Sequence, residues 1–279
     1  MTAPPRLTDR PALIRQRARA EAGGMARFLH DDLRAEIKER LGEVNRSFTA
    51  PAVVTGHPGL WSDLLPGAKV VADDPVLALE PGAHDLVIHV LCLHWADDPV
   101  GQVIQCARAL RPDGLFIAAL FGGRTLHELR AALAQAEAEA TGGLSPRVLP
   151  MGDIRELGAL LGRAGLALPV ADGITRRVLY RDPWHLMTDL RAMGEGNALA
   201  GRLRHPTRRA VLAGAAARYA GALAGPDGRI PATFETIVLT GWRPHYSQQK
   251  PLRPGSATAR LADALGTSER PLPDHGGRG

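Results

Sequence analysis

Hydrophobic residues recur along the chain with two different spacings, which separates predicted strands from predicted helices. Short apolar runs bounded by glycine, proline or aspartate predict strands at residues 53–54, 69–72, 85–92, 115–120, 174–180 and 231–240. Longer segments predict helices at residues 10–42, with a break at two glycines, 60–65, 98–110, 125–140, 153–164, 183–193 and 207–223. Strands that alternate with helices predict an α/β fold with a doubly wound, mostly parallel sheet.

The run at residues 85–92 marks the centre of this sheet. It reads Asp-Leu-Val-Ile-His-Val-Leu-Cys, which makes both faces of the strand apolar. This is typical of a parallel strand covered by helices on both sides. A predicted helix at residues 98–110 follows, and then the turn Arg-Pro-Asp-Gly at residues 111–114, where proline and glycine suit a reversal before the next strand.

The first predicted strand leads into a turn of the kind that binds nucleotides. In a doubly wound fold this turn usually reads GxGxxG, because bare backbone can then approach the ligand. Here the sequence Thr-Gly-His-Pro-Gly keeps only Gly56 and Gly59, with His57 and Pro58 between them. The turn therefore predicts a cofactor site that is only partly preserved.

Length and composition limit the domain organisation. A chain of 279 residues, 45% of them hydrophobic, can form one large α/β domain with an appendage or two small domains. We expect an N-terminal helical segment at residues 1–48 and a main domain at residues 49–265, with a helical insertion at about 183–225. The polar tail at residues 266–279 is expected to be disordered.

Charge and cysteine usage exclude several classes of protein. The net charge is +5, and arginines gather at residues 6–19 and 202–209. No aromatic residues interleave with them, so we expect solvated helix faces or a protein docking surface and no specific nucleic-acid binding. The two cysteines, Cys92 and Cys106, argue against a disulfide framework and favour a reducing compartment.

Other sequence signals are absent as well. No apolar run reaches the roughly 18 residues of a membrane span, and the N-terminus lacks the apolar core of a secretory signal. We expect a bacterial cytoplasmic protein that meets the inner membrane, if at all, through partners. GxSxG, HExxH and Walker motifs are missing. His185 and Asp189 lie four residues apart without a third ligand nearby, so we expect no metal site.

Longer motifs resemble one methyltransferase family. Residues 85–88 and 91–95 resemble its FDLVV and SLSLHW segments, and residues 110–116 are similar to LKPDGVF. Residues 121–130 resemble FGGDTLYELR, and residues 241–257 carry GWxxHxSQxxPxxxGSA. Over roughly residues 10–265 the chain resembles the BioC-like class I S-adenosylmethionine-dependent methyltransferases. Within these it is most similar to the branch that contains the mitochondrial assembly factor of respiratory complex I.

The resemblance implies a Rossmann-like sheet whose last strand is antiparallel, with S-adenosylmethionine as cofactor. In the family the glycine turn holds the methionine part, an acid after the second strand holds the ribose hydroxyls, and an acid after the third strand contacts adenine. Asp73 lies 14 residues after Gly59, fewer than the roughly 20 expected of a ribose acid. The distance from Asp73 to Asp85 leaves no room for another βαβ unit of roughly 30 residues. We therefore match Asp73 to the adenine acid and expect the second strand and its helix to be shortened or deleted.

The candidate residues fall into three groups. The cofactor-binding candidates are Gly56, Gly59, Asp73 and Phe121. His94 and Trp95 follow the central strand at its carboxyl end, where ligands bind in open α/β sheets, so they are the catalytic candidates. In the alternative interpretation, Trp95 covers the sheet and His94 bonds a backbone carbonyl. The substrate or partner candidates after the last strand are Trp242, His245, Ser247 and Gln248.

Three other positions have structural interpretations beside functional ones. His57 either replaces a lost cofactor contact or is a tolerated loop residue. Asp97 and Asp98 suit acids near an acceptor, but an aspartate before Pro99 indicates a helix N-cap first. The segment 193–197 is either the end of a lid or a simple helix terminus.

Four functions stay open. The resemblance implies a methyltransferase-family enzyme that acts on a protein partner in complex I assembly or modification, with a complex I subunit as the candidate partner. The mitochondrial member of the branch is linked to hydroxylating an arginine. The partly preserved cofactor turn equally allows a non-catalytic assembly or scaffold protein. The BioC branch implies O-methylation of malonyl-acyl carrier protein, and a different cofactor chemistry is also open.

Overall fold

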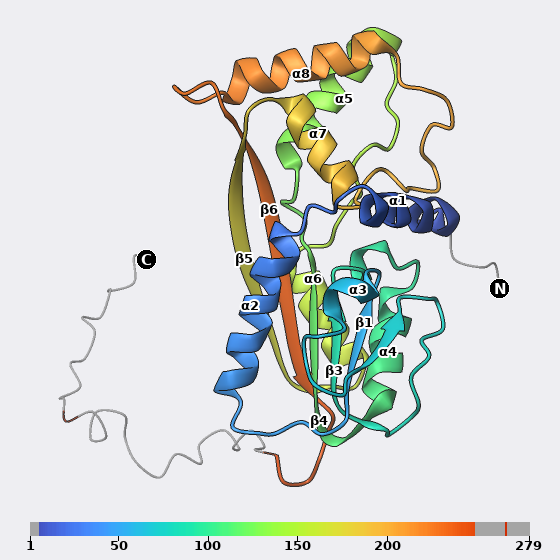
Figure 1. Cartoon of the computed structure of the whole chain (residues 1–279), viewed down its shortest axis with the longest axis vertical. Helices are drawn as coiled ribbons and strands as arrows, with labels where there is room; N and C mark the ends of the chain where they lie inside the picture. Colours follow the sequence, from blue (N-terminus) through green and yellow to red (C-terminus); the bar gives the residue numbers. More distant parts are fainter. Residues whose placement is uncertain (1–5, 249–265, 267–279) are drawn as a thin grey trace, which may run out of the picture. The chain divides into compact units, whose positions relative to one another are not determined.

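The computed structural model describes residues 6–248 and residue 266 (Figure 1). Residues 1–245 form one compact unit and residues 246–279 form a second. All the helices and strands of the described residues belong to the first unit. The tail predicted to be disordered, apart from residue 266, lies outside the described residues.

Six strands form one sheet in the described part of the chain. They are β1 (Pro51–Thr55), β2 (Lys69–Ala72), β3 (His84–Val90), β4 (Leu110–Phe121), β5 (Ala167–Tyr180) and β6 (Ile230–Trp242). Their order is β2-β1-β3-β4-β6-β5, and β6 alone runs antiparallel to its neighbours. The predicted α/β class, with a mostly parallel sheet and an antiparallel last strand, is confirmed.

Eight α-helices and one 3-10 helix connect these strands within the described residues. The α-helices are α1 (Arg10–Ala22), α2 (Phe28–Glu43), α3 (Pro58–Trp61), α4 (Pro99–Ala109), α5 (His127–Thr141), α6 (Ile154–Arg163), α7 (Pro183–Ala192) and α8 (Arg209–Leu223); the 3-10 helix η1 is Leu93–Trp95. Asp98 Oδ1 accepts a 2.8 Å hydrogen bond from the Gly101 amide, which confirms the predicted N-cap of α4. None of the described helices combines the length and the apolar character that crossing a membrane requires.

Helices cover both faces of the sheet and create two hydrophobic cores. Residues of α2, α5, α7 and α8 pack on one face, and residues of α4 and α6 pack on the other. Successive residues of β3 contribute to different cores: Ile88 belongs to the first and Val87 to the second. This two-sided burial explains why the strand is apolar throughout.

The turn predicted at residues 111–114 lies within β4 instead of before it. Asp113 adopts a left-handed backbone with φ of 62°, a conformation that aspartate tolerates better than most residues. A Cβ on Gly114 would lie 2.9 Å from the Arg111 carbonyl oxygen, so this position requires glycine. The pairing of β4 with β3 changes register here, from His84 beside Leu110 to Leu86 beside Leu115.

Two other predicted elements differ from the structure by four residues or more at one end. The helix predicted at residues 60–65 is α3, which begins at Pro58 and ends at Trp61. The strand predicted at residues 174–180 is the end of β5, which begins at Ala167 because it pairs with β6 as far as Trp242. Pairing between distant segments extends a strand that local sequence does not mark.

The connection between β2 and β3 determines where Asp73 lies. No helix occurs between these two strands in the described structure, and β2 pairs directly with β1, with Ala72 beside Thr55. In a doubly wound sheet the strand next to the first is the second strand. The structure therefore places Asp73 at the end of the strand in the second position. This differs from the spacing-based match to the third-strand adenine acid.

Candidate active site

Four parallel strands end at the same edge of the sheet and bring five of the predicted residues together. Gly56 and Asp73 follow β1 and β2, whose last residues pair. His94 and Trp95 lie in η1, directly after β3, and Phe121 ends β4. The ring centroids of His94 and Phe121 are 5.0 Å apart. This carboxyl edge is where open α/β sheets bind ligands.

The substrate or partner candidates do not join this group. Trp242 ends β6, and because β6 is antiparallel it pairs there with Leu115, at the opposite edge of the sheet. Its ring lies 5.4 Å from the Arg46 guanidinium, and His245 follows three residues later. Ser247 and Gln248 belong to the second compact unit. Their role in recognition stays a prediction.

An arginine from the N-terminal helix fills the glycine turn. The guanidinium of Arg17 lies against Gly56, where an added Cβ would come within 2.1 Å of Arg17 Nη1. Gly59 has no such neighbour, since a Cβ there would meet nothing within 4 Å. Figure 1 shows α1 lying at this end of the sheet beside α7. A side chain of the protein itself therefore occupies the space that the missing Cβ of Gly56 leaves.

The same arginine is paired with Asp73. Arg17 Nη1 lies 3.0 Å from both carboxylate oxygens, and Arg10, two turns earlier on α1, donates to them at 3.0 and 3.2 Å. Burial alone would raise the pKa of Asp73, but Arg17 and Arg10 lower it to about 2. We expected the N-terminal arginines to be solvated or to form a docking surface. For Arg17, which is only 4% exposed, that expectation is wrong.

Glu195, in the segment after α7, is a site residue that sequence reasoning did not select. Its Oε2 accepts a 2.8 Å hydrogen bond from Trp95 Nε1 and lies 3.5 Å from His94 Nε2. Burial would raise the pKa of Glu195, but His94 and Arg17 lower it to about 2. The only signal in the sequence was an acid between two glycines in a segment that we considered a possible lid.

His57 belongs to a buried chain of polar side chains. Its Nδ1 lies 3.1 Å from Glu21 Oε1, and its ring packs edge-on against His30 at 5.2 Å. His30 Nδ1 in turn accepts a 3.1 Å hydrogen bond from Trp61 Nε1. Burial, reinforced by His57, lowers the pKa of His30 to about 3, and burial beside Arg17 also lowers the pKa of His57. Both imidazoles are therefore neutral at physiological pH.

Asp97 and Asp98 have structural partners. Asp98 caps α4 as described above, and Asp97 Oδ1 accepts hydrogen bonds from the amides of Leu7 and Thr8 at 2.8 and 2.9 Å. Asp97 therefore fastens the segment that leads into α1 to the same edge as the candidate site.

The distribution of unpaired polar atoms tests whether this edge fits a ligand. Seven buried side-chain nitrogen or oxygen atoms of the described residues have no hydrogen-bond partner. All except His84 Nε2 belong to Gln16, Arg17, His57 and His94. Buried polar atoms in folded proteins are normally satisfied, so a concentration of unsatisfied ones indicates a place built for a polar ligand. The edge therefore fits a cofactor with polar groups.

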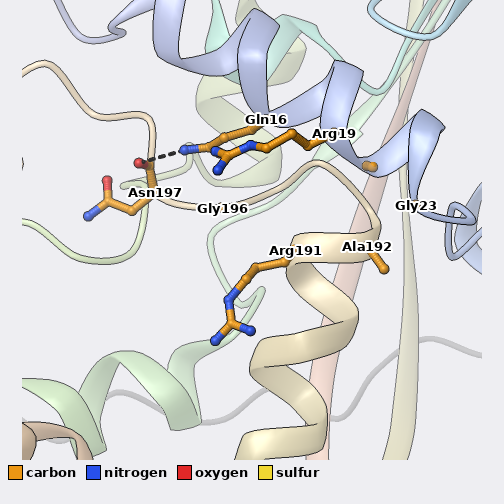
Figure 2. A pocket seen from close by; sticks show the side chains of 8 residues that line it. Gln16, Arg19, Gly23, Arg191, Ala192, Gly196 and Asn197 are labelled. Carbon is orange, nitrogen blue, oxygen red and sulfur yellow. Dashed lines mark hydrogen bonds between the residues drawn. The ribbon is translucent and has the colours of Figure 1, made fainter. Parts of the chain in front are cut away.

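Two cavities adjoin this edge on the side of α7. One, of about 210 Å³, is lined by apolar side chains of α5, α7 and β6 together with Trp95, Phe121 and Glu195. The other, of about 520 Å³, lies between α1 and α7 (Figure 2). Arg191, Gly196 and Asn197 line both. In Figure 2 Gln16 reaches across from α1 and donates a 3.1 Å hydrogen bond to the Asn197 carbonyl.

Metal ligation has no support in the part of the chain that the structure describes. No three histidine, cysteine or acidic side chains come together there in a group that could hold a metal ion. Asp189, one of the two residues weighed as ligands, accepts a 2.9 Å hydrogen bond from the Tyr180 hydroxyl.

Comparison with known proteins identifies the family. A family model described as "Methyltransferase domain" matches residues 60–118. The Danio rerio protein "Arginine-hydroxylase NDUFAF5, mitochondrial" is 40% identical over 232 residues, which cover 82% of this chain and 72% of that protein. The chain belongs to the NDUFAF5 family. The Mus musculus member is also 40% identical, over 81% of this chain and 65% of its own length.

A more distant relative agrees with this assignment. "Malonyl-[acyl-carrier protein] O-methyltransferase" of Halorhodospira halophila is 36% identical, covering 62% of this chain and 57% of that protein. A crystal structure described as a methyltransferase from Bacillus halodurans aligns with a TM-score of 0.49 at 10% identity, over 76% of this chain and 99% of that one. The resemblance to BioC-like methyltransferases of the NDUFAF5 branch is confirmed, and S-adenosylmethionine is the cofactor of this family.

Proposed function

We propose that this NDUFAF5-family protein uses S-adenosylmethionine at the carboxyl edge of its sheet to modify a protein partner in the assembly of respiratory complex I. The observation that supports this most directly is the edge itself. A glycine turn, a carboxylate on the strand next to β1 and a His-Trp pair converge there beside an open cavity. The arrangement has a place for a cofactor and a separate place for an acceptor.

Each part of the edge has a role in this proposal. Gly56, Gly59 and Asp73 would hold the cofactor, which supplies an activated methyl group when bound. Asp73 has the charge and the position of a ribose-binding acid, since it ends the strand beside β1. Trp95 and Phe121 border both the edge and the smaller cavity, so they would orient the acceptor there.

The protein partner is inferred from the relatives. The Danio rerio and Mus musculus proteins are named arginine hydroxylases, so an arginine side chain is the acceptor their names suggest for the family. Trp242 and His245 lie at the far edge of the sheet from His94. In this proposal they contact the body of the partner and not the reacting side chain.

The test combines cofactor binding with product mass. The purified chain is titrated calorimetrically with S-adenosylmethionine, then incubated with isolated complex I subunits, and the subunits are examined by mass spectrometry. A subunit that gains the mass of a methyl group supports methyl transfer, and a gain of one oxygen atom indicates hydroxylation. Absence of cofactor binding at millimolar concentration, together with normal NADH dehydrogenase activity in a deletion strain, would contradict the proposal.

A non-catalytic assembly protein is the second candidate. The observation that favours it is Arg17, which covers Gly56 and shares the Asp73 carboxylate with Arg10. A variant that no longer binds cofactor separates the two functions. If such a variant restores NADH dehydrogenase activity to a deletion strain as well as the wild type does, the scaffold function holds.

The third candidate is O-methylation of malonyl-acyl carrier protein, which the relative from Halorhodospira halophila favours. It predicts that deletion makes cells require biotin, whereas the assembly function predicts lost NADH dehydrogenase activity. Location distinguishes the candidates further. We place the protein in the cytoplasm, and the assembly function predicts that part of it sediments with inner membranes through its partner.

A further inference from the structure

The larger cavity, between α1 and α7, carries positive charge without an acid to balance it. Its volume of about 520 Å³ lies within the range of roughly 300–1,000 Å³ that is typical of ligand pockets. Arg19 lines it from α1 and Arg191 from α7 (Figure 2). None of the described residues that line it is acidic. Two cationic side chains in a cavity of this size favour a ligand with negative charge.

The arginines of α1 lie on two sides of the helix with different surroundings. Arg10 and Arg17 share the Asp73 carboxylate on one side, as described above. Arg19 lies on the opposite side, because two residues turn an α-helix by roughly 200°. Its Nε donates a 3.3 Å hydrogen bond to the Arg15 carbonyl, and no carboxylate pairs with it within the described residues. The protein therefore neutralises one side of α1 and leaves the side that faces the cavity charged.

Arg191 is in the same situation on the other wall. It lies in the last turn of α7, is exposed, and has no hydrogen-bond or ion-pair partner among the described residues. Like charges that line one cavity repel each other, and a ligand with negative charge removes this repulsion. Both guanidiniums can bind a carboxylate through two parallel hydrogen bonds, the geometry for which arginine is best suited.

The inner end of the cavity offers a hydrogen-bond acceptor. Gln16 Nε2 donates to the Asn197 carbonyl, and a Cβ on Gly196 would come within 2.7 Å of Gln16 Oε1. This oxygen is buried and has no hydrogen-bond partner among the described residues. A buried acceptor normally has a donor. A carboxylate alone supplies only acceptors, whereas a peptide with acidic side chains also supplies backbone N–H groups.

We propose that the larger cavity is a docking site for an acidic segment of the protein partner. Carboxylates of the segment pair with Arg19 and Arg191, and one of its backbone amides donates to Gln16 Oε1. Arg191, Gly196 and Asn197 also line the smaller cavity, so a chain held here continues directly to the proposed acceptor site. The inference rests on the proposed function and adds the surface that holds the partner beside the residue to be modified.

Two capped, fluorescently labelled peptides test the inference without any turnover. They are Gly-Glu-Glu-Gly-Glu-Glu-Gly and its neutral analogue Gly-Gln-Gln-Gly-Gln-Gln-Gly. Fluorescence anisotropy with the full chain at low salt should show the glutamate peptide binding about tenfold or more tighter than the glutamine peptide. The difference should shrink as sodium chloride is added, because salt screens exposed charges.

Arginine variants locate the binding. Arg19→Gln and Arg191→Gln should each weaken the glutamate peptide by about threefold or more, and the double variant should bind both peptides equally. Arg15→Gln is the matched control, since it removes the same charge from an exposed position of α1 that does not line the cavity. Neither Arg19 nor Arg191 has a carboxylate partner among the described residues, so the double variant should unfold at the same urea concentration as the wild type.

A further variant tests the cavity without changing any charge. Ala192→Phe adds bulk to the lining and should weaken the glutamate peptide severalfold. The inference is overturned if the two peptides bind equally to the wild type, if Arg15→Gln weakens binding as much as Arg19→Gln, or if Ala192→Phe has no effect. It is also overturned if inorganic phosphate, a single-stranded oligonucleotide or anionic vesicles bind more tightly than the glutamate peptide. These outcomes leave the cofactor titration and the NADH dehydrogenase assay as they stand, so the proposed function is judged separately.

Discussion

The proposed cofactor side and the proposed acceptor side of the carboxyl edge are built in opposite ways. On the cofactor side the chain satisfies its own carboxylate: Asp73 has two arginine partners, and Arg17 occupies the space over Gly56. On the acceptor side an apolar cavity stays open, and Glu195 Oε1 has no hydrogen-bond partner among the described residues. In this comparison α1 controls whether a ligand can reach Gly56 and Asp73, whereas the cavity on the other side is open to a ligand without any change in α1.

The largest expected effect concerns the ion cluster on the cofactor side. Asp73→Ala leaves Arg17 buried without its carboxylate, so we expect the free energy of unfolding in urea to fall by about 3–5 kcal/mol. Asp74→Ala is the control, because the Asp74 side chain is 62% exposed and its carboxylate lies 3.4 Å from Arg10, so the substitution should cost less than about 1 kcal/mol. Equal losses in the two variants would show that the cluster adds nothing special to the cofactor side.

Acidification should weaken the cofactor side next. The pKa of His30 in the folded chain is about 3, whereas its ordinary value is 6.5. The unfolded chain therefore binds the extra proton first, so the free energy of unfolding is highest above pH 6.5 and falls as the pH decreases toward 3. At about pH 4.5 the loss should be about 2–3 kcal/mol. His30→Gln keeps an acceptor for Trp61 Nε1 and should show a flatter dependence between these pH values in urea unfolding. A parallel pH dependence for both proteins would assign the effect to other groups.

Adding a side chain at the glycine turn should lower the free energy of unfolding by a smaller amount. The methyl group of Gly56→Ala would overlap the Arg17 guanidinium and move it off Asp73, which should cost about 1–3 kcal/mol in thermal or urea unfolding. Gly59→Ala is the matched control, since nothing lies within 4 Å of its Cβ, and it should be neutral or slightly stabilising. A tolerated Gly56→Ala would mean that Arg17 can leave the turn freely.

The smallest expected effect concerns the cofactor itself. Arg17→Gln removes the group that covers Gly56 and competes for Asp73, so we expect S-adenosylmethionine to bind about tenfold tighter in calorimetry. Arg10→Gln, which loses contacts with Asp73 without uncovering Gly56, should change the affinity less. Weaker binding to Arg17→Gln would instead make Arg17 a ligand of the cofactor, and the contrast between the two sides would disappear.

Local sequence patterns predicted most of the fold because strand burial and helix capping depend on neighbouring residues in the sequence. The two-sided apolar run of β3 follows from helices on both faces, and the Asp98 cap follows from unpaired amides at the start of α4. The sequence also placed Gly56 and His94 at the same carboxyl edge, since both follow parallel strands. The position of Asp73 was misjudged because counting residues cannot show which strand β2 pairs with.

The two residues that sequence reasoning missed depend on distant partners. Arg17 and Asp73 are separated by 56 positions, and Glu195 and Trp95 by 100. An arginine in a charged helix is usually solvated, and only the seven-residue spacing of Arg10 and Arg17 placed both on one face. Burial of such residues results from tertiary packing, which no local pattern records.

The shortened connection after β2 also bears on self-association. Within residues 6–248 no further strand lies beyond β2, so β2 is the outer strand of the described sheet on that side. Free strand edges invite pairing with neighbouring molecules, and short, charged edges discourage it. β2 has four residues and begins with the exposed Lys69, which is held 3.3 Å from Glu80. The free edge of the sheet is therefore short and charged, and it offers another molecule little backbone with which to pair.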